Sequence, residues 1–284
     1  ELLTLRLGGA PSPRTLKRLW ERTQGWPAVV GLLGLDEAAG ESDDDASEAL
    51  RRFVVEELLG DLRPPLRYVL KAVSILDGIE ADSALALLSE PVNGRQLTGP
   101  VSRFISVPEP QVARHLESLA VDQIVGSSST TDARKELNPA IREILASLFE
   151  GEDPRAFRLA HHRVAEHYLR QPALDSVATI EHLVEAGDLE RAMSLLEPQI
   201  DHLHDQGVDA ALSRWLKRLE AHFKTLPLWV NYHLARIYTE EGALEQAKRH
   251  LEQCKAGLKS WEEAGLLWRW HPRLCLGFAT ISWR

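Results

Sequence analysis

Apolar residues recur at steps of three and four along most of this chain, which is the spacing that places side chains on one face of an α-helix. The sequence LRYVLKAVSIL is one example, because its apolar positions share a face: Leu66, Val69, Leu70, Val73 and Leu76. Nearly every segment after residue 153 has the same period. The pattern therefore predicts a mainly α fold.

Residues 1–48 carry a predicted helix over residues 13–35 that is interrupted at Gly25-Trp26-Pro27. Proline is tolerated in the first turn of a helix, so the apolar run AVVGLLGL after Pro27 is expected to form a second, buried helix. The acidic sequence GESDDDASE that follows is typical of a solvated linker. We treat these 48 residues as one segment of the chain.

The next segment, residues 49–152, combines short helices with a β-hairpin. Helices are predicted over residues 49–62, 66–76, 82–88 and 111–125. Two short strands, residues 123–126 and 135–137, flank the polar sequence SSSTTDAR, which is typical of a hairpin connection. Pro139 then begins a further helix. Three or four helices followed by a hairpin is the order of a winged-helix domain.

Residues 153–284 contain an internal repeat. EAGDLERAMSLLE (185–197) matches EEGALEQAKRHLE (240–252), with a glycine and an alanine at equal offsets. Small residues let two antiparallel helices approach closely, and the glycine closes the turn between them. The second copy has tetratricopeptide spacing at Ala235, Tyr238, Gly242, Ala247, Leu251 and Cys254. We predict a tetratricopeptide-like superhelix over this region.

Charge argues against nucleic acid as the partner. The 284 residues carry a formal net charge of -9, whereas nucleic-acid binders usually present a basic face. The helix before the hairpin mixes Arg114 with Glu117 and Asp122, and the hairpin connection holds one arginine. That is a poor phosphate clamp, so direct DNA contact by this chain is not favoured.

The expected compartment is the cytoplasm. No apolar run approaches the roughly 18 to 20 residues that cross a bilayer. Cys254 and Cys275 fall at apolar helical positions, as buried thiols do in a reducing environment. The chain begins at Glu1 without a basic and apolar leader, so we expect it to be a fragment of a longer protein.

The sequence shows no catalytic or metal-binding motif that would indicate an active site. His161, His162 and His167, and the pair His202 and His204, have helical spacings that do not converge on one point. HExxH and a serine nucleophile elbow are absent, and the dipeptide Gly-Lys of a phosphate-binding loop does not occur. We therefore predict no catalytic residue, no metal site and no enzyme activity for this chain.

The order TQGWPAVVGLL, acidic loop, LRPPLRYVLKAVSIL and EDPRAFRLAHHRVAEHYL, followed by the repeats, resembles the MalT-like transcriptional regulators. These are bacterial signal-transduction ATPases with numerous domains (STAND). The resemblance implies that residues 1–48 are the lid of a nucleotide-binding domain, 49–152 a winged helix and 153–284 a sensor. It also implies an ATPase domain before this chain and an output domain after it.

The same resemblance suggests where a nucleotide is sensed. In such proteins the Gly-x-Pro step lies beside the adenine of ADP, which maps onto Trp26 and Pro27; the alternative is that Trp26 only packs the lid. Asn138, in the string ELNP, stands where the family has a histidine that reaches the phosphate. Asparagine carries no charge, so phosphate sensing there is expected to be weakened or lost. ATP or ADP would bind the full-length protein, and this fragment holds no cofactor.

Two tryptophans late in the chain suggest a partner surface. Trp268 and Trp270 are two residues apart, so on one helix they cannot both face the same core, and one is left for a ligand, a partner or a following repeat.

Two functions follow from these patterns. The first is a regulatory module that receives a small-molecule inducer or a regulatory protein at the repeats and controls its own ATPase domain, with self-oligomerisation in the full-length protein. The alternative is a tetratricopeptide scaffold whose winged helix binds DNA.

Overall fold

A computed structural model describes residues 50–88, 109–121, 125–127, 135–173 and 175–263, together with residues 17 and 48. The chain folds as two compact units, residues 1–172 and 173–284. The described part is mainly helical, which confirms the predicted fold class. No helix in the described ranges is long and apolar enough to cross a membrane.

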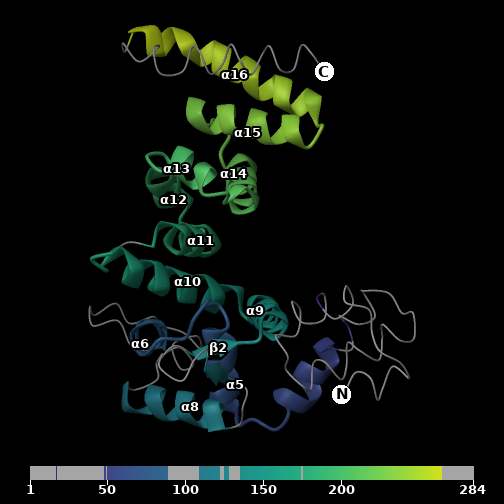
Figure 1. Ribbon diagram of the computed structural model, residues 1–284, viewed down its shortest axis with the longest axis vertical. Helices are drawn as coiled ribbons and strands as arrows, with labels where there is room; N and C mark the ends of the chain where they lie inside the picture. Colours follow the sequence, from purple (N-terminus) through teal and green to yellow (C-terminus); the bar gives the residue numbers. More distant parts are fainter. Residues whose placement is uncertain are drawn as a thin grey trace. The chain divides into compact units, whose positions relative to one another are not determined.

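The first unit contains five α-helices and a two-stranded sheet among its described residues (Figure 1). The elements are the π-helix η1 (Val54–Leu58), α5 (Pro64–Val73), α6 (Ala81–Leu88), α8 (Glu109–Val121), β1 (Val125–Ser127), β2 (Lys135–Leu137), α9 (Pro139–Glu152) and α10 (Pro154–Leu169). β1 and β2 pair antiparallel with Gly126 opposite Glu136, so the predicted hairpin is confirmed. α10, which the sequence analysis placed with the repeats, packs on α6 and α9.

Apolar residues at helical spacing build the core of this unit. Val69, Leu70 and Val73 of α5 are fully buried, as their shared face predicted. The ring of Phe149 on α9 meets that of Phe157 on α10 edge to face, with centroids 5.7 Å apart. The adjoining helices α9 and α10 are thereby packed together at their junction.

The helix that contains Leu50 ends in a form that the sequence pattern did not predict. After Phe53 it widens into the π-helix η1, and a Cβ added to Gly60 would lie 1.9 Å from the carbonyl oxygen of Glu56. Only glycine fits this close approach of two backbone segments. Arg67 then donates to the carbonyl oxygens of Leu62 (2.6 Å) and Gly60 (2.8 Å), which caps the end of the helix.

The second unit is built from helices α11 to α16 in succession (Figure 1). Their bounds are α11 (Ser176–Ala186), α12 (Leu189–Leu196), α13 (Ile200–Asp205), α14 (Asp209–His222), α15 (Leu228–Glu240) and α16 (Leu244–Glu263). Ala192 and Ala247, the small residues of the internal repeat, are both buried. α11 packs on α12, and α15 packs on α16, which confirms two helix pairs at the repeated sequences.

Glycines close the turns of this unit in the left-handed conformation. Gly187 and Gly242 have φ angles of 82° and 77°. In both turns the residue after the glycine donates to a carbonyl five positions earlier, as Ala243 does to Tyr238 (2.8 Å). Gly207, between α13 and α14, makes a third turn of the same kind with a φ of 77°, and the sequence analysis missed it.

The turn at Gly242 gives a stability test. Because nothing lies within 4 Å of an added Cβ, Gly242→Ala introduces no clash but forces alanine into the left-handed region. We expect the free energy of unfolding, measured by urea denaturation, to fall by about 1 to 2 kcal/mol. Gly242→Asn should lose less, because asparagine tolerates this conformation. Gly151→Ala, in α9 with open space around it, is the opposite control and should stabilise by up to about 1 kcal/mol. An unchanged stability of Gly242→Ala would contradict the turn assignment.

Candidate functional site

The sites predicted from the sequence fall mostly outside the described residues. Trp26 and Pro27, the expected adenine contacts, lie there, and so do Trp268 and Trp270, the expected partner surface. These four assignments therefore stay predictions. Asn138 is described.

Asn138 is the N-cap of α9. Its side-chain Oδ1 accepts hydrogen bonds from the backbone N–H groups of Ala140 (3.1 Å) and Ile141 (3.4 Å). Pro139 is the first residue of the helix and has no N–H to satisfy. The oxygen of Asn138 thus serves its own helix. An asparagine directly before a proline and a helical apolar pattern is a helix-start signal, so this role was readable from the sequence.

The histidines do not assemble a metal centre among the described residues, where no group of three or more His, Cys, Asp or Glu side chains could hold a metal ion. His161 is buried against the ring of Phe157, with ring centroids 4.4 Å apart. His202 of α13 contacts Gln206, the C-cap residue of that helix. Each of these rings has a packing or hydrogen-bonding contact within the fold.

A polar cluster in the second unit joins α14 to α15 and α16, and we call it the polar lock. It consists of Asn231 and His250, which are buried, and Glu220 and Tyr238, which are partly buried. Nδ2 of Asn231 donates to the carbonyl oxygens of Leu226 (3.0 Å) and Pro227 (3.2 Å). Its Oδ1 therefore faces Nδ1 of His250 at 2.9 Å and accepts from it. Because His250 is only 2% exposed, this bond orients the ring firmly.

Glu220 completes the polar lock with both carboxylate oxygens. Oε1 lies 3.0 Å from Nε2 of His250, and Oε2 accepts from the hydroxyl of Tyr238 at 2.6 Å. Both ring nitrogens of His250 thus face oxygen atoms, Oδ1 of Asn231 and Oε1 of Glu220. The Tyr238 ring stacks on that of His250, with an interplanar angle of 11°.

α14 is also joined to α11 by charged pairs. Glu181 accepts from the indole Nε1 of Trp215 (2.5 Å), a side chain with no exposed surface, and from Arg214. Glu185 accepts two bonds from Nη1 of Arg218, at 2.9 and 3.0 Å. The position of α14 is therefore set from two sides, by α11 and by the polar lock.

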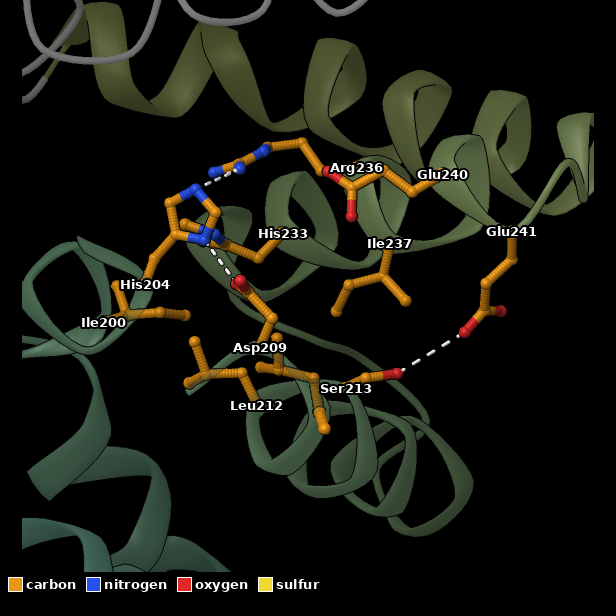
Figure 2. A pocket seen from close by; sticks show the side chains of 12 residues that line it. Ile200, His204, Asp209, Leu212, Ser213, His233, Arg236, Ile237, Glu240 and Glu241 are labelled. Carbon is orange, nitrogen blue, oxygen red and sulfur yellow. Dashed lines mark hydrogen bonds and ion pairs between the residues drawn. The ribbon is translucent and has the colours of Figure 1, made fainter. Parts of the chain in front are cut away.

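A pocket of about 340 Å³ opens beside the short helix α13, between it, α14 and α15 (Figure 2). This interhelical pocket is at the small end of the range that holds small-molecule ligands. Its apolar lining includes Ile200, Leu212, Leu216 and Ile237. Nothing in the hydrophobic period marks such a site, because the pocket exists only where three helices meet.

Three charged or polar side chains cross one end of the interhelical pocket, one from each helix (Figure 2). Arg236 donates to Nε2 of His204 at 2.8 Å. A guanidinium only donates, so this nitrogen accepts and the ring proton lies on Nδ1, which donates to the carboxylate of Asp209. His204 thus lies between Asp209 and Arg236, with one ring nitrogen facing each of them.

The lining also includes Ser213, His233, Glu240 and Glu241. Glu241 accepts from Lys217 (2.5 Å) and from the Ser213 hydroxyl (3.5 Å). Glu240 lines the same pocket and is exposed. The pocket therefore offers one arginine, three carboxylates (Asp209, Glu240 and Glu241) and an apolar floor, an arrangement suited to binding a ligand.

The capping role of Asn138 predicts a mutational result. Asn138→Ala removes the acceptor of two helix N–H groups, so the free energy of unfolding should fall by about 1 kcal/mol. Asn138→Asp keeps an acceptor and adds a favourable charge at the helix start, and should be close to wild type. Urea denaturation monitored by circular dichroism measures both. Equal stability of the alanine variant and the wild type would show that the cap contributes nothing.

The polar lock predicts a late tyrosine ionisation. Burial, and then the hydrogen bond to Glu220, raise the pKa of Tyr238 from 10.0 to about 12. The neutral phenol therefore stabilises the fold fully below pH 10, and that contribution is lost as the pH rises through 12. Ultraviolet titration should show a tyrosinate step near pH 12 that is absent in Tyr238→Phe.

A second variant separates the two causes of the raised Tyr238 pKa, burial and the hydrogen bond to Glu220. Glu220→Gln should lower the pKa of Tyr238 only in part, because burial is the larger cause. Ionisation of Tyr238 at its ordinary pKa in the wild-type chain would contradict the polar lock.

Comparison with known proteins does not assign this arrangement to a family. A scan against profiles of protein families found none that matches the chain, and a search of curated proteins found no similar sequence. The function is therefore inferred from the residues and their geometry.

Proposed function

We propose that this chain is the regulatory and sensor part of a bacterial STAND-type transcriptional regulator. In this proposal the second unit is a tetratricopeptide-like array that receives a small molecule or a regulatory protein. Residues 1–48 are the lid of the nucleotide-binding domain, and residues 49–152, which include the hairpin, are a winged helix that relays the signal to an ATPase domain of the full-length, cytoplasmic protein. ATP or ADP belongs to that domain, and this chain is not an enzyme.

The observation that carries the proposal is the interhelical pocket. It is ligand-sized, it has an apolar floor and it lies in a succession of helix pairs joined by similar glycine turns. Helical arrays of this kind bind partners on surfaces formed between neighbouring helices. The resemblance in element order to MalT-like regulators supports the remaining assignments, including Trp26 and Pro27 as contacts of the nucleotide.

The contacts of Asn138 are relevant to the proposed loss of phosphate sensing. Its Oδ1 is engaged in capping α9, which leaves this oxygen committed to the helix. A neutral side chain engaged in this way supports the view that phosphate sensing by the winged helix is reduced in this protein. Regulation would then depend more on the array than on the nucleotide.

The alternative of a DNA-binding winged helix is tested directly. The exposed side chains of α8 include both Arg114 and Glu117, so we expect no DNA complex tighter than about 1 µM at physiological salt. A mobility-shift titration of the chain with random duplexes measures this. Tight binding that weakens steeply with salt would overturn the proposal in favour of the scaffold. Loss of such binding in Arg114→Glu would then place the contact on α8.

A further inference from the structure

Some charged side chains of the interhelical pocket form ion pairs with an opposite charge, whereas others do not. Arg236 contacts the ring of His204 and forms no ion pair with a carboxylate in the described part of the chain. A protonated guanidinium in a pocket, with an imidazole as its partner, retains donors for an anion. A ligand carboxylate is the group that best matches those donors.

Glu240 adds a negative charge to the pocket, opposite in sign to that of Arg236. Lys217 neutralises the neighbouring Glu241, whereas Glu240 has no hydrogen bond or ion pair with another residue among those described. Arg236 and Glu240 are four residues apart on α15, so they lie on the same face of the helix (Figure 2). An ammonium group on the ligand would satisfy Glu240 while the carboxylate satisfies Arg236.

The apolar floor of the pocket favours a ligand with an apolar side chain. Ile200, Leu212 and Leu216 are buried, and Ile237 from α15 points toward Leu212 (Figure 2). Apolar ligand groups buried against this lining gain affinity because they leave water. A branched aliphatic side chain suits such a lining better than a polar one.

We propose that the interhelical pocket binds a free α-amino acid with an apolar side chain, whose carboxylate pairs with Arg236 and whose ammonium pairs with Glu240. This inference rests on the proposed function, because it names the chemical class of the signal that the array receives. A simple carboxylic acid is disfavoured by the repulsion of Asp209 and Glu240. A simple amine leaves the guanidinium of Arg236 without an anion.

Calorimetric titration of the full chain tests the proposal with three probes that share one carbon skeleton. L-leucine has both charges, 4-methylpentanoate lacks the ammonium and 3-methylbutylamine lacks the carboxylate. We expect L-leucine to bind with a Kd below about 1 mM and the other two to bind at least about tenfold more weakly. Absence of L-leucine binding, or an equal affinity for either single-charge probe, would overturn the proposal.

Substitutions test whether Arg236 binds the carboxylate of the ligand and Glu240 its ammonium group. Arg236→Gln and Glu240→Gln should each weaken L-leucine binding about tenfold or more, whereas Arg236→Lys should weaken it less because the charge remains. Lys248→Gln and Glu245→Gln remove the same charges from exposed positions of α16 outside the pocket and should leave the affinity unchanged. Circular dichroism confirms that each variant is folded. Unchanged binding in folded Arg236→Gln would contradict the assignment.

The outcomes separate this inference from the proposed function. A chain that binds neither L-leucine nor DNA remains a sensor module but loses this class of ligand. A chain that binds DNA tightly loses the regulatory proposal, whatever its affinity for L-leucine.

Discussion

The carboxylate of Glu220 holds together the part of the array on which the pocket depends. One oxygen faces buried His250 on α16 and the other accepts from Tyr238 on α15, so a single side chain of α14 is bonded to two further helices. Removing the Glu220 side chain would leave the Tyr238 hydroxyl and Nε2 of His250 without this partner, which destabilises the fold. The relative position of α14 and α15 is therefore fixed by polar bonds as well as by apolar packing.

This constraint explains why a pocket is maintained between these helices. α14 is held on its other side by Glu181 and Glu185 of α11, so it has little freedom to move toward α15 and close the space. Lys217 extends the same set of contacts, since its ammonium group neutralises Glu241 and lies 5.4 Å from the centre of the Tyr238 ring. The pocket that results is pre-formed, which lowers the ordering cost of binding a ligand.

Periodicity and turn residues predicted the helices and the hairpin well, because both signals are local. The face of α5 around Val69, the hairpin at Gly126 and the turns at Gly187 and Gly242 follow from residues a few positions apart. The turn at Gly207 was missed because leucine, Leu212, stands where the other two copies have a buried alanine. The Asn-Pro cap of α9 is a local signal too, although Asn138 was considered only as the replacement of a phosphate-sensing histidine.

The site itself was beyond sequence reasoning. Glu220 and His250 are 30 residues apart, and nothing in either position distinguishes a buried ion pair from two solvated helical residues. The interhelical pocket likewise requires Ile200, Leu212 and Ile237 to converge from three helices.

Amide hydrogen exchange of the full chain with and without saturating L-leucine tests most directly whether the pocket binds this ligand. It should show added protection in α13, α14 and α15, and none in α5 or α9. Exchange that is unchanged in these three helices would contradict a ligand site held between α14 and α15.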